Sequence, residues 1–148
     1  MQKAKINFNT VGRSWFATDP TAARMLLNKV TPMLIDTNLI AHVWNYINAY
    51  FGTDMEENNK RILFAGCVYK MFSPGSLLPA KAVNAPAGVR AEMAKVLGYV
   101  NGSNINSWKK IATVYVKNPK YNEAKLNIVI DHFKPYSVNP ADWELQLN

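Results

Sequence analysis

The sequence predicts an all-α fold: a single compact domain of about six helices, with a short extended N-terminal arm and an irregular C-terminal tail. Three observations support this fold class. The chain has 148 residues, of which 49% are apolar, enough for one domain with a real core. Apolar residues recur every three or four positions in several segments. Helix-start and helix-stop residues, mainly asparagine or aspartate before proline and glycine afterwards, separate those segments.

The first 18 residues are predicted to form an extended basic arm. Ile6 and Phe8 alternate with polar neighbours, as in a short extended segment or an edge strand. Positive charge in the arm comes from three residues: Lys3, Lys5 and Arg13.

The helical domain is predicted over residues 19–133. It begins at Asp19-Pro20, where aspartate suits the N-cap and proline the first helical position. A second, amphipathic helix is predicted over residues 38–51, with Gly52 as its stop. A third should start in the acidic residues 54–58, where negative charge suits the helix dipole, and end near residue 72. Its second half is apolar on all sides, which predicts the central buried helix.

Three further helices are predicted after a connection over residues 73–88 that contains three prolines and two glycines. They cover about residues 87–97, 103–117 and 118–133, and residues 134–148 form the tail. The helical spacing predicts that the following apolar residues face the core: Met25, Leu26, Leu27, Val30, Ile105, Trp108, Ile111, Ala112, Tyr115, Tyr121, Ala124, Ile128, Val129 and Phe133.

Positive charge is concentrated in residues 81–125. The formal net charge of the chain is +7, and this segment holds eight lysine or arginine residues against two glutamates, Glu92 and Glu123. Charge gathered in one segment can form a field that attracts an anionic polymer such as nucleic acid.

The same segment has the features of a helix–turn–helix. Ala94 is a small residue within the first helix, Gly98 opens the turn, and Ile105 is an apolar residue that would fix the angle of the second helix, with Trp108 one turn later. On these residues, segment 88–112 resembles bacterial and phage helix–turn–helix DNA-binding domains. Ile105 and Trp108 follow Ala94 by eleven and fourteen residues, one more than in the usual pattern, because the turn is one residue longer.

This resemblance implies that the second helix of the helix–turn–helix-like segment, residues 88–117, lies in the major groove of DNA. Its asparagines would pair with base edges, and its lysines would contact phosphates. The predicted nucleic-acid contacts are Arg90, Ser103, Asn104, Asn106, Ser107, Lys109, Lys110 and Lys117, with Lys3, Lys5 and Arg13 of the arm as contacts in an adjacent groove. The alternative is ordinary helical packing with a solvated basic face.

A second class of function stays open: a phage-type structural or assembly protein that uses its arm and tail for subunit contacts. Such terminal segments often become ordered against a neighbouring subunit. Trp143 and Leu147 are the predicted subunit contacts in the tail. The 17 asparagines, and the excess of lysine over arginine, are typical of phage and mobile-element proteins.

Catalytic chemistry is not predicted. Neither His42 nor His132 has a cysteine or second histidine at metal-ligand spacing, and no phosphate-binding glycine loop occurs. We therefore expect no enzyme activity, no metal and no cofactor. The lone Cys67 is expected to be a small buried apolar residue. Without a membrane-length apolar run or a secretion signal, the expected location is the cytoplasm, or the host cytoplasm or virion if the protein is phage-encoded.

Overall fold

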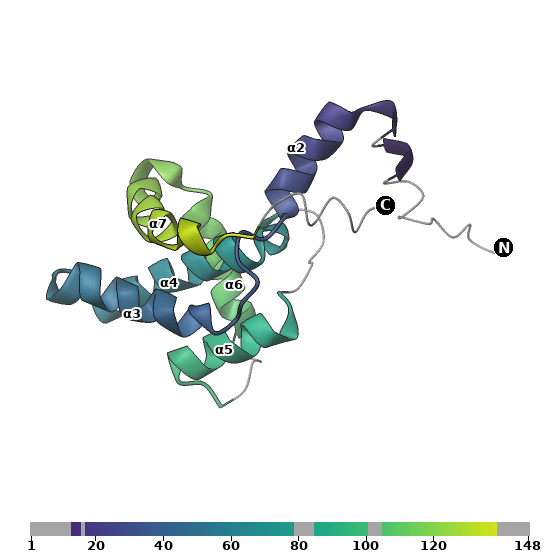
Figure 1. The fold of residues 1–148 in the computed structure, drawn as a ribbon. Helices are drawn as coiled ribbons and strands as arrows, with labels where there is room; N and C mark the ends of the chain where they lie inside the picture. The colour runs from purple at the N-terminus through teal and green to yellow at the C-terminus, as the bar shows by residue number, and fades with distance from the viewer. Residues whose placement is uncertain (1–12, 16, 79–84, 101–104, 139–148) are drawn as a thin grey trace. The chain divides into compact units, whose positions relative to one another are not determined.

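A computed structural model describes residues 13–15, 17–78, 85–100 and 105–138 (Figure 1). Within these residues the chain forms helices and turns and no strand, so the all-α prediction is confirmed. The chain divides into two compact units, residues 1–31 with 139–148, and residues 32–138. These boundaries differ from the predicted helical domain, 19–133, because the first long helix belongs to the smaller unit.

The described part of the smaller unit is helical. Helix α2 spans Pro20–Val30, and Asp19 caps it as predicted, since its carboxylate accepts a hydrogen bond from the Ala22 N–H at 3.1 Å. Residues 13–15 and 17–18 are helical as well. There the Thr18 hydroxyl donates to the Ser14 carbonyl, and the Asp19 N–H donates to the Trp15 carbonyl. Both hydrogen bonds join residues four positions apart, as in a helix, so this part of the arm is helical and not extended as predicted.

The exposure of side chains in the smaller unit differs in part from the prediction. Met25 and Leu26 are exposed, although the helical spacing placed them toward a core. Arg13 is exposed and lies in the helical stretch. The remaining predicted contacts of the arm and tail lie outside the described residues: Lys3, Lys5, Trp143 and Leu147.

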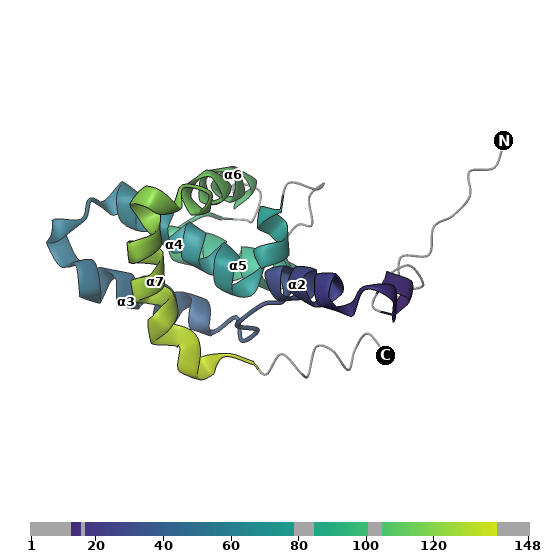
Figure 2. The same cartoon turned by 90° about the horizontal axis from the view of Figure 1, so that it is seen from above.

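The larger unit is organised around helix α4, Glu57–Phe72. Its residues 63–69 are all buried, as predicted for a central helix. Each of the other long helices of this unit contacts α4: α3 (Leu39–Phe51), α5 (Ala87–Leu97), α6 (Ile105–Val116) and α7 (Pro119–Phe133). Helices α3 and α6 lie on different sides of α4 (Figure 2).

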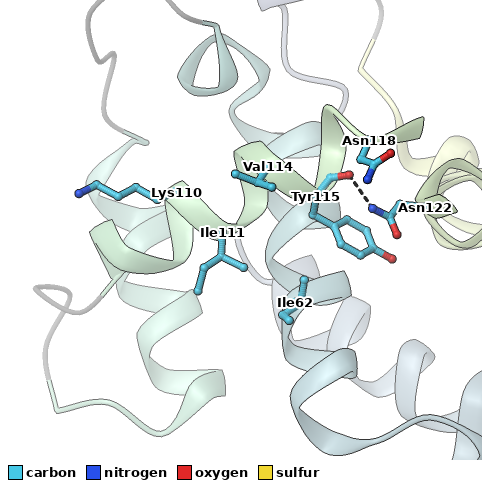
Figure 3. Close-up of a pocket in the computed structure, with 7 residues that line it drawn as sticks. All are labelled: Ile62, Lys110, Ile111, Val114, Tyr115, Asn118 and Asn122. Carbon is cyan, nitrogen blue, oxygen red and sulfur yellow. Dashed lines mark hydrogen bonds between the residues drawn. The ribbon is translucent and has the colours of Figure 1, made fainter. Parts of the chain in front are cut away.

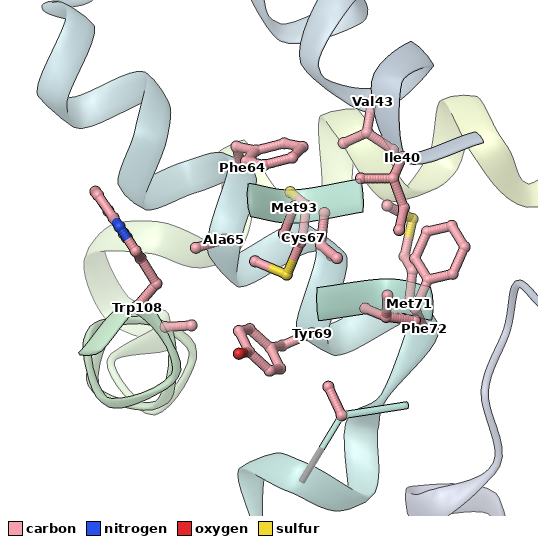
Figure 4. Close-up of a cluster of buried hydrophobic side chains, with 14 of the residues drawn as sticks. Ile40, Val43, Phe64, Ala65, Cys67, Tyr69, Met71, Phe72, Met93 and Trp108 are labelled. Carbon is pink, nitrogen blue, oxygen red and sulfur yellow. The ribbon is translucent and has the colours of Figure 1, made fainter. Parts of the chain in front are cut away.

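The core of the larger unit brings all of these helices together. Figure 4 shows Phe64, Cys67 and Met71 of α4 among side chains from the other helices, such as Met93 of α5 and Trp108 of α6. Aromatic packing contributes here too, since the rings of Trp44 and Phe64 pack edge to face with 5.4 Å between their centroids.

Short 3₁₀ turns connect the helices: η1 (Gly52–Asp54), η2 (Pro74–Leu77) and η4 (Lys134–Tyr136). Gly52 ends α3 as predicted, with a φ of 53° that glycine adopts at little cost. The predicted tail, 134–148, is structured at its start, because η4 follows α7 directly. Beyond η4, the Val138 N–H donates to the Met33 carbonyl at 3.0 Å, which joins the two ends of the larger unit.

Candidate functional site

The turn after α5 has the glycine geometry that the sequence predicts. Gly98 has a φ of 80°, in the left-handed region. Its N–H donates to the Lys95 carbonyl at 3.3 Å, and the Tyr99 N–H donates to the Ala94 carbonyl at 2.8 Å. This pair of hydrogen bonds is a Schellman motif, which ends a helix and turns the chain away from its axis.

The start of α6 is fixed from two sides. Trp108 is 8% exposed, and its indole N–H donates to the Tyr99 hydroxyl at 2.8 Å. On the other side, the Tyr69 hydroxyl of α4 donates to the carbonyl of the buried Ile105 at 3.4 Å. Helix α6 packs mainly against α4, with a smaller contact to α5.

The closest approach of α4 and α6 occurs at a glycine. A Cβ placed on Gly66 would lie 3.1 Å from Cδ1 of Tyr115 and 3.5 Å from Cδ2 of Leu126. Glycine at this position leaves room for the Tyr115 ring against the α4 backbone.

Three of the predicted nucleic-acid contacts are exposed on α6 or directly after it. Ser107 and Lys110 lie on α6, and Lys117 follows its last residue, Val116. Lys109 is half-buried. The other contacts predicted in this stretch, Ser103, Asn104 and the side chain of Asn106, lie outside the described residues.

Arg90 has a different environment from the exposed phosphate contact that the sequence predicted. Its side chain is half-buried. Burial raises the pKa of Tyr69 to about 12, and the nearby charge of Arg90 partly opposes this effect. Arg90 therefore interacts with the inside of the unit, because α5 turns this position toward α4.

Helix α7 extends the basic surface. Lys120 and Lys125 are exposed, and the Lys120 ammonium lies 5.5 Å from the centre of the Tyr121 ring. Residues 105–125 contain five lysines and a single acidic residue, Glu123. The α6 and α7 surface thus keeps the positive charge that the sequence concentrates in this segment.

A groove of about 450 Å³ lies beside Lys110 (Figure 3). Its walls are mostly apolar, and it runs over α6 between α4 and the start of α7. Lys110 stands at its edge and extends away from Ile62 of α4. The lining residues are Ile62, Lys110, Ile111, Val114, Tyr115, Asn118 and Asn122.

Ile111 and Tyr121, which the helical spacing placed toward the core, are 39% and 67% exposed. Tyr121 does not line the groove. Ile111 lines it together with Val114, which is 71% exposed. The reason is geometric: α7 begins three residues after α6 ends, and the two helices leave this apolar face of α6 uncovered.

Two asparagines line the groove, although little of its accessible surface is polar. The side-chain N–H of Asn122 donates to the Tyr115 carbonyl at 2.9 Å, which leaves the amide oxygen as an acceptor. Asn118 precedes α7, and its side chain makes no capping hydrogen bond. Sequence reasoning placed Asn118 only as a helix start and did not select Asn122. The sequence signal that could have indicated both residues is their spacing: they are four residues apart, on either side of Pro119, the first residue of α7.

Within the described residues, no cluster of three or more histidine, cysteine, aspartate or glutamate side chains could hold a metal ion. His132 stacks on the Tyr46 ring at 3.8 Å. Burial raises the pKa of the Cys67 thiol well above its usual range, an effect that the Lys70 charge only partly opposes. None of the helices seen has both the length and the apolar character needed to cross a membrane.

Comparison with protein-family models, curated proteins and solved structures found no match to this chain.

Proposed function

We propose that the protein is a non-enzymatic nucleic-acid-binding protein that contacts phosphates through α6 and the start of α7. One observation carries the proposal: Lys110, Lys117, Lys120 and Lys125 are all exposed on adjoining helices. When lysines neutralise phosphates, the counterions condensed on the nucleic acid are released. This release supplies binding affinity that does not depend on the nucleotide sequence.

The helix–turn–helix resemblance supports the same function and gives Ser107 a role. Its hydroxyl is exposed in the first turn of α6, where it can hydrogen-bond to a phosphate or a base edge. Lys110 follows Ser107 by three residues and therefore lies on the same side of the helix. Among the predicted contacts of residues 105–117 whose side chains the structure describes, these two residues and Lys117 are the exposed ones.

The test measures binding of the full chain to a fluorescein-labelled, mixed-sequence oligonucleotide by anisotropy at several salt concentrations. Lys110→Gln combined with Lys117→Gln should weaken binding at least tenfold and flatten the plot of log affinity against log salt. The expected change in slope is about 1.4 for a single strand and about 1.8 for a duplex, for two lost phosphate contacts.

The matched control makes the same change of charge elsewhere on the unit. Lys70 of α4 and Lys95 of α5 are also exposed, so Lys70→Gln with Lys95→Gln should lower the affinity less and keep the salt slope. Equal effects of the two double variants would show that the net charge, and not the α6 surface, determines binding. An absence of nucleic-acid binding at low salt would overturn the proposal.

A second candidate function, subunit assembly, is favoured by the exposed apolar side chains of Ile111 and Val114. It predicts a defined oligomer that loses its subunit contacts when Trp143 and Leu147 are changed to alanine. Size-exclusion chromatography with light scattering decides this. A monomer at all concentrations, for both the parent chain and the double variant, would argue against assembly.

A further inference from the structure

We propose that the groove beside Lys110 accepts an unstacked nucleobase, so that the protein binds single-stranded nucleic acid in preference to duplex. This inference rests on the proposed function and adds the class of ligand. Lys110 lines the groove and belongs to the basic surface as well, so one strand can occupy both.

The walls of the groove suit the faces of a base. Ile62, Ile111 and Val114 provide aliphatic surface, and the half-buried ring of Tyr115 provides aromatic surface. Bases stack on aromatic and apolar side chains without regard to sequence, because every base has a π-face. In a duplex the bases are already stacked and paired, so entry of one would require unpairing. The apolar groove therefore favours a strand whose bases are free.

Asn118 and Asn122 lie on the wall of the groove, although little of its accessible surface is polar. Asn122 keeps its amide oxygen as an acceptor after donating to the Tyr115 carbonyl. Asn118 carries an amide with both donor and acceptor groups and uses neither in a helix cap. Hydrogen bonds of this kind recognise the exposed edges of unpaired bases.

The charge around the groove suits the backbone of a strand. Lys110 stands at the edge of the groove and extends away from Ile62 (Figure 3), and Lys117 follows the end of α6. A base held against Tyr115 would thus have its phosphates on the lysine side. The groove has a volume of about 450 Å³ and is largely open to solvent.

The experiment compares two probes and one pair of matched variants by anisotropy. The probes are a fluorescein-labelled 15-nucleotide mixed-sequence DNA strand and the same strand annealed to its complement. Val114→Ser removes apolar surface from the groove without changing charge. Val100→Ser is the control, because Val100 is fully exposed in the turn after α5 and does not line the groove. Circular dichroism verifies the fold of both variants.

The parent chain should bind the single strand at least fivefold more tightly than the duplex. Val114→Ser should weaken binding to the single strand by about tenfold, as for the loss of one base contact, and should keep its salt slope. Val100→Ser should match the parent. Asn118→Ala should also weaken single-strand binding, and it removes no capping hydrogen bond.

Three results would overturn the inference. Tighter binding to duplex, with Val114→Ser unchanged, would leave the proposed function in place and exclude the base pocket. Failure of the parent to bind either probe would remove the proposed function as well. Self-association of the parent that Val114→Ser abolishes, without any effect on DNA binding, would assign the groove to a protein partner.

Discussion

Trp108 donates its indole N–H to the hydroxyl of Tyr99 over 2.8 Å, which joins the first turn of α6 to the turn that follows α5. Both residues belong to the segment that resembles a helix–turn–helix. Sequence reasoning assigned Trp108 to packing alone, but it also makes a polar contact. Its hydrogen-bond acceptor is the side chain of Tyr99, the residue directly after Gly98.

Tyr99→Phe should lower the free energy of unfolding by about 1–3 kcal/mol. The change keeps the ring but leaves the N–H of the buried Trp108 without an acceptor, and a buried donor without a partner costs about that much. Denaturant unfolding followed by tryptophan fluorescence measures the change. The exposed Tyr121→Phe serves as the control and should stay within about 0.5 kcal/mol of the parent. An equal effect of both variants would refute the structural role of this hydrogen bond.

Gly66→Ala should destabilise the protein relative to Gly88→Ala by about 1–3 kcal/mol, since a Cβ at residue 66 would lie 3.1 Å from the Tyr115 ring, which must then shift in a packed site. Both changes add a methyl group within a helix and gain helix propensity, so this gain largely cancels in the comparison. At Gly88 the new methyl would meet only Thr37, at an ordinary 3.5 Å. Thermal and denaturant unfolding of both variants check this. Equal stabilities would show that α6 does not approach α4 as closely as the structure has it.

Stability should fall as the pH rises from about 10 to about 12. Burial raises the pKa of Tyr69 and of Tyr115 from 10.0 to about 12, with Arg90 opposing the shift at Tyr69 and Cys67 adding to it at Tyr115. In this window the unfolded chain has released protons that the folded protein keeps, so the free energy of unfolding decreases. Tyr69→Phe should make this decrease shallower, as measured by denaturant unfolding at several pH values. A slope identical to that of the parent would contradict the raised pKa of Tyr69.

Cys67 should not react with a thiol reagent such as DTNB while the protein is folded. The side chain is fully buried, and its thiolate is disfavoured because burial raises its pKa. The rate of labelling should therefore follow the unfolded fraction across a denaturant titration. Rapid labelling in buffer without denaturant would mean that α4 is accessible in the native state.

Local signals predicted much of the fold. Asp19 caps α2 through its side chain, Gly52 and Gly98 end α3 and α5, and the apolar stretch after residue 62 is the buried part of α4. Each of these depends on interactions within about four residues, which the sequence displays directly. The charge of the α6 and α7 surface was likewise visible as a count of lysines.

The groove could not be predicted, because it depends on which face of α6 the other helices leave open. The spacing of Ile111 and Tyr121 is that of core residues, but both side chains are exposed and Ile111 lines the open groove. Arg90 shows the reverse: a residue expected at the surface is half-buried because α5 turns it toward Tyr69. Tertiary contacts of this kind override helical periodicity.

Helix α4 offers a way to detect ligands through hydrogen exchange. The other long helices of the larger unit all contact it, so its amide protons should reach solvent deuterium only when the unit opens as a whole. A molecule that binds only the folded state lowers the population of the globally open state. Amide exchange then slows by the factor one plus the ligand concentration divided by the dissociation constant. Mass spectrometry of peptides from residues 63–72 would thus register an oligonucleotide bound at α6, although none of those amides touches it.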